Sequence, residues 1–207
     1  MNFNQEFPAI VRDLLEQGSS GVIASIISQE GSAPRHAGTK MIIGADGRTH
    51  GTIGGSVLEA RVIEEAGHVI KDGRSKLVEY DLTNRNLNVP EMICGGTTTV
   101  MLDYLSPVPE NIDLFRGWHD AVTNGDEFSC LTIIKEGENA VSVAARCLLF
   151  NDGQIAGQCP LPETDLEQVK SRGRGARVFS DFRVNDWRVL LEPVRNVTTL
   201  YCFGAGH

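Results

Sequence analysis

Residues 51–59 read Gly-Thr-Ile-Gly-Gly-Ser-Val-Leu-Glu, and this stretch decides how the first half of the chain is interpreted. The consecutive glycines Gly54 and Gly55 predict a tight turn, because glycine adopts backbone conformations that other residues avoid. Ser56 and Glu59 form a Ser-x-x-Glu capping box, which predicts that a helix begins here. Free N–H groups at a helix start favour an anion, so we expect Gly54 and Gly55 to face a phosphate or oxyanion.

The preceding loop carries the positive charge of the same candidate site. Residues 31–40 read Gly-Ser-Ala-Pro-Arg-His-Ala-Gly-Thr-Lys, in which Arg35 follows a proline and stands between Ser32 and Lys40. A lone surface arginine is usually a solvated charge, but a guanidinium also binds phosphate or carboxylate through two hydrogen bonds. Because Arg35 stands between Ser32 and Lys40, we interpret it as a candidate clamp for an anion.

Cys94 is the candidate functional thiol. It opens the sequence Cys-Gly-Gly, so Gly95 and Gly96 leave the backbone beside it bare. A thiolate at this position would be stabilised by N–H groups and by Arg35 or Lys40, if these converge. Cysteine is commonly only a small buried residue, which is the interpretation for Cys130, Cys147 and Cys202. The five cysteines show no C-x-x-C spacing, so we expect reduced thiols and no structural metal.

Hydrophobic periodicity predicts a mixed α+β fold built from two tandem α-β-β-β-α-β-β units. Helices are expected at 5–17, 56–73, from 109 and from 164, and strands at 22–28, 40–43, 48–53, 75–82, 97–105, 128–135, 144–150, 177–181 and 187–193. The Asp-Gly turns at Gly47 and Gly153 lie 106 residues apart, and the helix starts at Ser56 and Thr164 lie 108 apart. We interpret this as an internal duplication, although a coincidence within a common arrangement is the alternative.

The expected divisions are a first, glycine-rich repeat at 1–105, a second repeat packed with it at 106–196, and a short segment at 197–207. That segment ends in Phe-Gly-Ala-Gly-His, an apolar strand running into Gly-x-Gly as a Rossmann unit begins. Gly204 and Gly206 make an incomplete dinucleotide motif, which predicts a longer parent protein. The glycine-rich loop, the paired glycines and Cys-Gly-Gly occur only in the first repeat, so the chemistry is expected there.

Composition narrows the function classes. The formal net charge of −8 and the isoelectric point near 5.1 argue against nucleic-acid binding, which needs a basic face. We find no apolar run long enough to span a bilayer and no signal peptide at the N-terminus. A cytoplasmic protein is therefore expected.

Six blocks of this sequence resemble the xanthine dehydrogenase accessory family, XdhC/CoxI. They are Gly-Ser-Ala-Pro-Arg (31–35), Gly-Thr-Lys-Met (38–41), the stretch 51–59, Cys-Gly-Gly (94–96), Leu-Glu-Pro (191–193) and Phe-Gly-Ala-Gly-His (203–207). Their order and spacing match from residue 31 to the end. Where the family often has a third glycine this chain has Ser56, and where some members have cysteine it has Val57, which leaves Cys94 as the candidate thiol.

The resemblance implies a molybdenum cofactor chaperone rather than a catalyst. Such a protein would bind molybdopterin, protect it during sulfuration by a cysteine desulfurase, and insert it into apo-xanthine dehydrogenase or a related molybdenum hydroxylase. The candidate cofactor-binding residues are Ser32, Arg35, Lys40, Gly54, Gly55, Ser56, Glu59, Cys94, Gly95 and Gly96. Cys94 would lie near the molybdenum, and whether it ligates the metal, carries a persulfide or only lines the pocket stays open.

The resemblance further implies a homodimer and a following Rossmann domain, and two other classes of function remain. One is an NAD(P)-dependent oxidoreductase whose Rossmann domain lies outside this sequence. The other is a protein–protein adaptor without bound cofactor.

Overall fold

The computed structural model describes residues 3–31, 35–82, 96–136 and 141–195. The first repeat contains α1 (Phe3–Glu16), β1 (Gly21–Gly31), β2 (Lys40–Gly44), β3 (Thr49–Gly51), α2 (Ser56–Asp72), β4 (Lys76–Asp81) and β5 (Gly96–Leu105). The second contains α3 (Pro109–Asn124), β6 (Phe128–Glu136), β7 (Val141–Phe150), β8 (Ile155–Gly157), α4 (Glu163–Gly173), β9 (Ser180–Val184) and β10 (Trp187–Val194). No helix in these ranges is long and apolar enough to cross a membrane.

The predicted α+β fold and its repeated α-β-β-β-α-β-β order are confirmed. Each repeat forms an antiparallel sheet of five strands, with the orders β3-β2-β1-β5-β4 and β8-β7-β6-β10-β9. The second order follows from the first when each strand number is raised by five. The topology is therefore the same in both halves, as a duplication requires.

One predicted strand is displaced: 177–181 was expected, and β9 runs from Ser180 to Val184. The cause is a turn of two residues between β9 and β10. Val184 and Trp187 are register partners, and Asn185 between them has a φ of 49°. Asparagine tolerates this left-handed conformation, so the turn sits later than the prediction placed it and sets where β9 ends.

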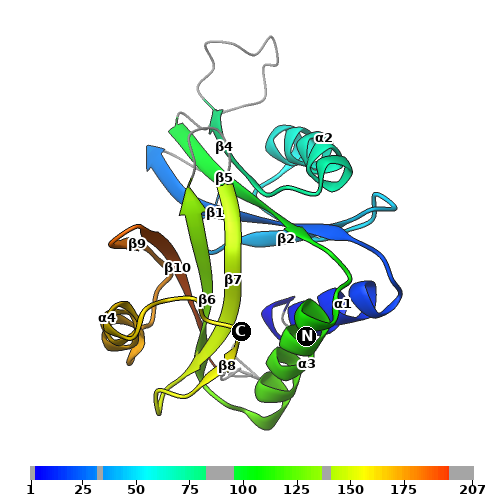
Figure 1. The fold of residues 1–207 in the computed structure, drawn as a ribbon. Coiled ribbons are helices and arrows are strands. Elements are labelled where there is room, and N and C mark those ends of the chain that lie inside the picture. The colour runs from blue at the N-terminus through cyan, green and yellow to red at the C-terminus, as the bar shows by residue number, and fades with distance from the viewer. Residues whose placement is uncertain (1–2, 32–34, 83–95, 137–140, 196–207) are drawn as a thin grey trace, which may run out of the picture.

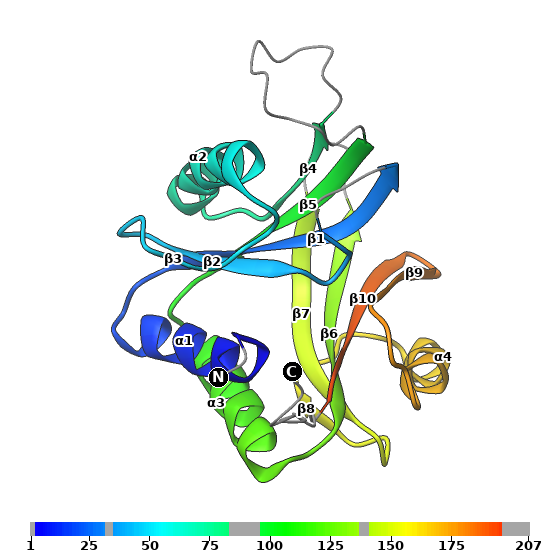
Figure 2. The ribbon, with the colours of Figure 1, turned by 180° about the vertical axis from the view of Figure 1, so that it is seen from behind.

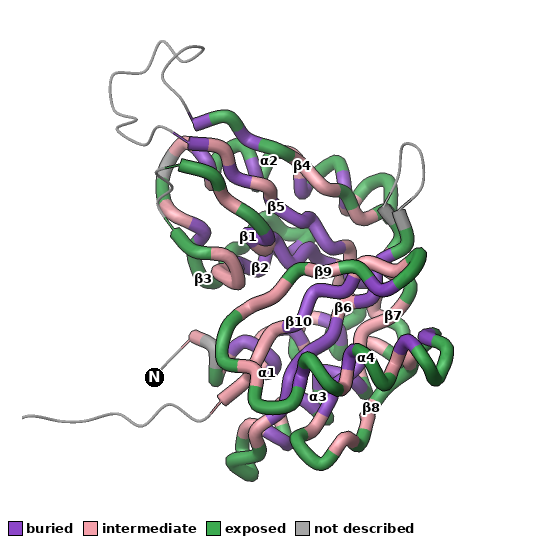
Figure 3. Tube along the Cα trace, turned by 90° about the vertical axis from the view of Figure 1, so that its left-hand side faces the viewer, coloured by how far each residue is buried: buried purple, intermediate pink, exposed green. Residues whose placement is uncertain are grey.

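Two sheets face each other and carry helices on their outer sides (Figures 1 and 2). Helix α2 covers the first sheet, and helix α4 lies against the second. Between the sheets, Ile27 and Met101 of the first pack with Ile134 and Leu190 of the second. The buried segments of both sheets run through this central layer (Figure 3). Each repeat therefore has an apolar cluster of its own under its helix, and further clusters join the two repeats.

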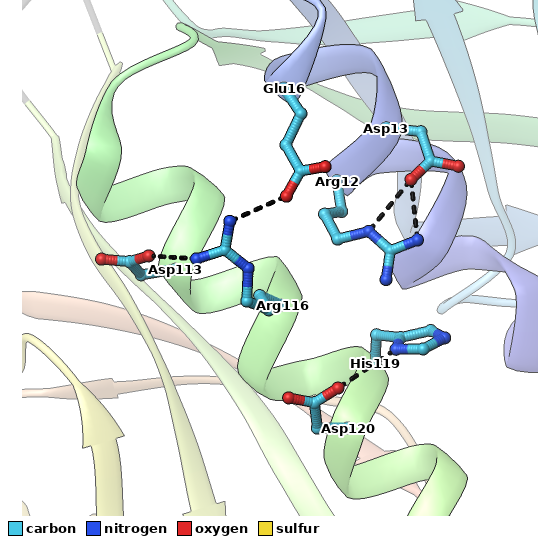
Figure 4. A network of polar contacts seen from close by, with 7 residues as sticks. All are labelled: Arg12, Asp13, Glu16, Asp113, Arg116, His119 and Asp120. Atoms are coloured by element: carbon cyan, nitrogen blue, oxygen red, sulfur yellow. Dashed lines mark hydrogen bonds and ion pairs between the residues drawn. The ribbon is translucent and has the colours of Figure 1, made fainter.

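Helices α1 and α3, the first element of each repeat, lie side by side at one flank of the sheets (Figures 1 and 2). Their contact is apolar inside, where Phe7 of α1 packs against Phe115 and Trp118 of α3. On the solvent side, Arg116 of α3 donates to Glu16 of α1 at 2.8 Å (Figure 4). Such an exposed pair contributes little, so aromatic burial holds these helices together.

Two buried ion pairs join the repeats reciprocally. Lys40 at the start of β2 pairs with Glu192 on β10, and Arg146 on β7 pairs with Asp103 on β5. Lys40 and Arg146 are separated by the same 106 residues as the two Asp-Gly turns. Asp103 and Glu192 each stand two residues before the end of their strand. Each repeat thus gives a cation to the other and takes a carboxylate from it.

The Lys40–Glu192 pair generates a stability prediction. The Lys40 side chain is 4% exposed, whereas that of Glu192 is 27% exposed. Removing the carboxylate leaves the ammonium buried without its partner. Removing the ammonium leaves a carboxylate that is partly exposed to water. We expect Glu192→Leu to lower the free energy of unfolding by about 3 kcal/mol and Lys40→Met by clearly less, measured by urea denaturation.

The double variant Lys40→Met/Glu192→Leu serves as the control. It should recover most of the loss, because no unpaired charge stays buried. Losses that simply add in the double variant would show that the two side chains do not depend on each other.

Candidate functional site

A cleft of about 440 Å³ opens where the glycine-rich loop of the first repeat meets β10 and the segment before β9 of the second. We call it the first cleft. Its lining residues come from both repeats: Phe3, Arg35, Ala37, Gly38, Thr39, Lys40, Gly51, Thr52, Arg177, Phe179, Glu192 and Pro193. Gly38 and Gly51 have φ values of 89° and 85°, so the turns that shape its wall need glycine. The cleft therefore exists only because the repeats pack together.

Arg35 and Arg177 give the first cleft its positive charge. Both are exposed, and within the described ranges neither guanidinium has a hydrogen-bond or ion-pair partner. Arg35 belongs to the first repeat and Arg177 to the second. Two exposed cations that come from distant parts of the chain to one cleft can together bind an anionic group.

Lys40 lines the same cleft, but its charge has a partner within the chain. Its ammonium is paired with Glu192 and lies 4.4 Å from the ring centroid of Phe7 and 5.5 Å from that of Trp118. Lys40 thus lines the cleft with its charge already paired, and its contact with a cofactor stays a prediction. Its charge is used between the repeats, as part of the wall of the cleft.

The helix start at residues 54–59 also differs from expectation. Gly55, not Ser56, occupies the cap position of α2, and no side chain caps the helix there. Glu59 does reach back, and its Oε1 accepts from the N–H groups of Gly55 and Ile53, each at 3.1 Å, and from the Thr52 hydroxyl. A carboxylate of the chain itself thus occupies the position that we expected an external anion to take.

The N–H groups of the paired glycines both have acceptors within this loop. The Gly54 N–H donates to Thr52 Oγ1 at 3.2 Å, and the Gly55 N–H donates to Glu59. Neither glycine lines the first cleft, although Thr52 of the same loop does. The loop therefore supports the wall of the cleft. Both N–H groups have acceptors within the chain here, and their binding of an external anion stays a prediction.

Several predicted site residues lie outside the described residues: Ser32, Cys94, Gly95, Gly204 and Gly206. Gly96 is described; it is buried at the start of β5, and its carbonyl accepts from the N–H of Leu82 at 2.8 Å. Its register partner is Gly31, the last residue of β1. The described residues next to Ser32 and next to Gly95 are therefore neighbours in the sheet.

A second cleft of about 700 Å³ occupies the equivalent place in the other repeat. Gly157 lines it as Gly51 lines the first cleft, and Arg146 lines it as Lys40 does. Gly51 and Gly157 are 106 residues apart, and so are Lys40 and Arg146. Gly157 also has a positive φ of 95°. In place of Gly38 this wall has Ala144, so the two clefts share a framework but differ in the loop that carries Arg35.

Sequence reasoning missed Arg177. It was assigned to a strand, and no local motif marks it. The block Leu-Glu-Pro was noticed, and its Glu192 and Pro193 do line the first cleft. That block could have indicated that the second repeat contributes to the site.

The fold and the site together define a two-repeat α+β protein with a basic cleft between its repeats. Residues 14–81 match the XdhC and CoxI family. That match covers 68 of the 207 residues of the chain.

Two curated relatives come from Escherichia coli (strain K12). The chain is 33% identical over 89 residues to the uncharacterized protein YqeB, covering 43% of this chain and 16% of that protein. It is 28% identical over 93 residues to the molybdenum cofactor insertion chaperone PaoD, covering 45% of this chain and 29% of that protein. The chain thus spans less than a third of the length of either relative.

A solved structure described as a xanthine dehydrogenase from Bacillus halodurans has the same fold. It superposes with a TM-score of 0.61 at 22% identity, over 73% of this chain and 45% of that one.

The Glu59 contacts generate a prediction about pH. Partial burial raises the pKa of Glu59, but hydrogen bonds from Thr52, Gly55, Ile53 and Gly54 outweigh it and lower the pKa below 4.5. The folded-state pKa is then below the unfolded one, so this stabilisation is complete above pH 4.5 and disappears as pH falls through the folded pKa.

We expect Glu59→Ala to lower the free energy of unfolding by about 1 kcal/mol at pH 7, with the difference from wild type shrinking as the pH falls below 4.5. Urea denaturation at a series of pH values measures it. Glu64, on the same helix, provides the control through Glu64→Ala. A difference that is constant with pH would contradict the role given to the Glu59 carboxylate.

Proposed function

We propose that the chain binds the molybdenum cofactor in the first cleft and passes it to a molybdenum hydroxylase of the xanthine dehydrogenase type. The observation that carries this proposal is the convergence on a cleft between the repeats of two guanidiniums, Arg35 and Arg177, that have no partner among the described residues. The match of residues 14–81 to the XdhC and CoxI family and the similarity to a protein named as a molybdenum cofactor insertion chaperone support the choice of ligand.

The chemistry of molybdopterin fits this cleft. The cofactor carries a phosphate and, at the metal, anionic oxo groups, and guanidinium binds such oxygens through paired hydrogen bonds. A cleft of about 440 Å³ lies within the size range of small-molecule sites. Arg35 and Arg177 would hold the phosphate, and the Thr52 hydroxyl offers a further polar contact at the rim.

Lys40 and Glu192 would act by position, since their ion pair keeps the two walls of the cleft at a fixed separation. A fixed cleft orders fewer groups on binding and so loses less affinity.

Cys94 would approach the metal or the sulfur being transferred, which makes it the residue through which the chain protects the cofactor during sulfuration. Ser32 and Gly95 would border it, because their described neighbours, Gly31 and Gly96, are register partners. A cysteine desulfurase and the apo-hydroxylase are the partners in this proposal. It also takes the protein to act in the cytoplasm as a homodimer.

Two other functions compete with the proposal. In an NAD(P)-dependent oxidoreductase, a longer protein that contains this chain would bind nucleotide and turn over substrate. In a protein adaptor, the purified chain would carry no pterin. Mass spectrometry of the purified protein for pterin distinguishes a carrier from an adaptor.

The arginine clamp is tested by binding of molybdopterin to Arg35→Ala and Arg177→Ala. Each variant loses one charged pair of hydrogen bonds, so we expect the dissociation constant to rise about tenfold or more. Anaerobic titration followed by pterin fluorescence measures it.

Arg48→Ala is the matched control, because Arg48 is an exposed arginine of the first repeat whose side chain is 85% exposed and lies outside the cleft. Unchanged affinity in both cleft variants, or an equal loss in the control, would remove the clamp from the proposal.

Cys94 is tested separately with Cys94→Ala. If its thiol contacts the metal or the transferred sulfur, the variant should retain the phosphate contacts, bind molybdopterin more weakly, and activate the apo-hydroxylase poorly. Binding and activation that both match wild type would exclude Cys94 from the site.

A further inference from the structure

The second repeat holds two cysteines that the proposed function does not use. Cys147 is buried on β7, opposite Gly157 of β8, and Cys159 follows two residues after β8 ends. Both contact the apolar cluster between the second sheet and α4. The cluster contains Leu131, Leu161 and Val169.

The two cysteines meet in this one cluster, with Cys147 inside it and Cys159 packed against it. The two thiols interact there, and the interaction raises the pKa of Cys147 and lowers that of Cys159. Cys159 begins the sequence Cys-Pro-Leu-Pro, in which two prolines restrict the backbone on its C-terminal side. The chain is therefore held in place on both sides of the contact, by the β7–β8 ladder and by the prolines.

The two thiols differ in access and in charge. Cys159 is partly exposed, whereas Cys147 is buried. The hydrogen bond from Cys147, the N–H of Leu161 and the charge of Lys170 together lower the pKa of Cys159 to about 6. The contact with Cys159 and burial raise the pKa of Cys147. Cys159 is thus the nucleophile that a reagent reaches, and Cys147 is the thiol placed to follow it.

We propose that Cys147 and Cys159 form a reversible dithiol–disulfide couple that reacts with small disulfides. The Cys159 thiolate attacks one sulfur of the small disulfide, forms a mixed disulfide and releases one thiolate. Cys147 then gives up its proton to solvent and attacks the Cys159 sulfur, and the second small thiolate leaves. In total, two protein thiols and one small disulfide become one protein disulfide and two small thiols.

The couple borders the second cleft. Arg146 and Leu148, on either side of Cys147, line that cleft, as do Gly157 and Gln158 before Cys159. The disulfide would bind the end of β8 covalently to β7 and so fix this wall. The inference is independent of the molybdenum cofactor, since none of these residues lines the first cleft.

Digestion with trypsin allows a direct test, because no lysine or arginine lies between Cys147 and Lys170 and both thiols remain in one peptide. The folded protein is equilibrated with glutathione and glutathione disulfide, quenched in acid, alkylated and digested. We expect peptide 147–170 to lose two hydrogen atoms and to become resistant to alkylation, and dithiothreitol should reverse both changes.

Cys130→Ser is the matched control, because Cys130 is also buried in this repeat and burial raises its pKa to about 12. It should form the same disulfide, whereas Cys159→Ser should stay reduced at Cys147. In the urea-unfolded chain the equilibrium constant for forming the disulfide should be lower by about tenfold or more, because the fold no longer brings the sulfurs together.

The rate of alkylation of Cys159 checks the assigned order. It should be half-maximal near pH 6 in wild type. The midpoint should rise in Cys147→Ala and rise less in Cys147→Ser, whose hydroxyl still donates a hydrogen bond. A peptide that keeps two alkylatable thiols, or that stops at a glutathione adduct on Cys159, would overturn the proposal.

Discussion

The reciprocal exchange of charge between the repeats is the constraint on which the structure depends. Lys40 meets Glu192 and Arg146 meets Asp103, so every one of these four groups has its partner in the other half of the chain. Removing one partner within the intact fold would leave a charge unpaired in a largely buried layer, which is far costlier than losing a surface pair. Both clefts lie against these ion pairs, and their walls come from both repeats. The binding surface is thus a product of how two similar units pack, and not of either unit alone.

Much of the fold could be predicted from the sequence because its signals are local. Hydrophobic periodicity located the helices, and two Asp-Gly turns located equivalent hairpins. The position of β9 was missed because the turn after it depends on an asparagine with positive φ. In the sequence alone, such an asparagine cannot be told from any other polar residue. The candidate site was harder to predict, because which cation is free depends on contacts across the chain. Lys40 resembles a ligand-binding charge until Glu192, 152 positions away, is placed beside it.

The same distinction explains the glycine loop. The sequence indicated correctly that backbone N–H groups gather before α2, but the anion that they bind is the carboxylate of Glu59, within the loop. Arg177 had no local signal and reached the site only through the packing of the second repeat. The two clefts share a framework, yet only the first contains the loop with Arg35, while the second borders a pair of thiols. Duplication thus provides two hollows, and different side chains make them chemically distinct.

The central claim is that the ligand sits between the repeats and is held by both. Amide hydrogen exchange, measured with and without molybdopterin, tests this most directly. Our account predicts protection in two segments far apart in sequence, 35–40 and 177–179, and little change in 142–146 of the second cleft. Protection confined to one repeat, or found only at the second cleft, would contradict it.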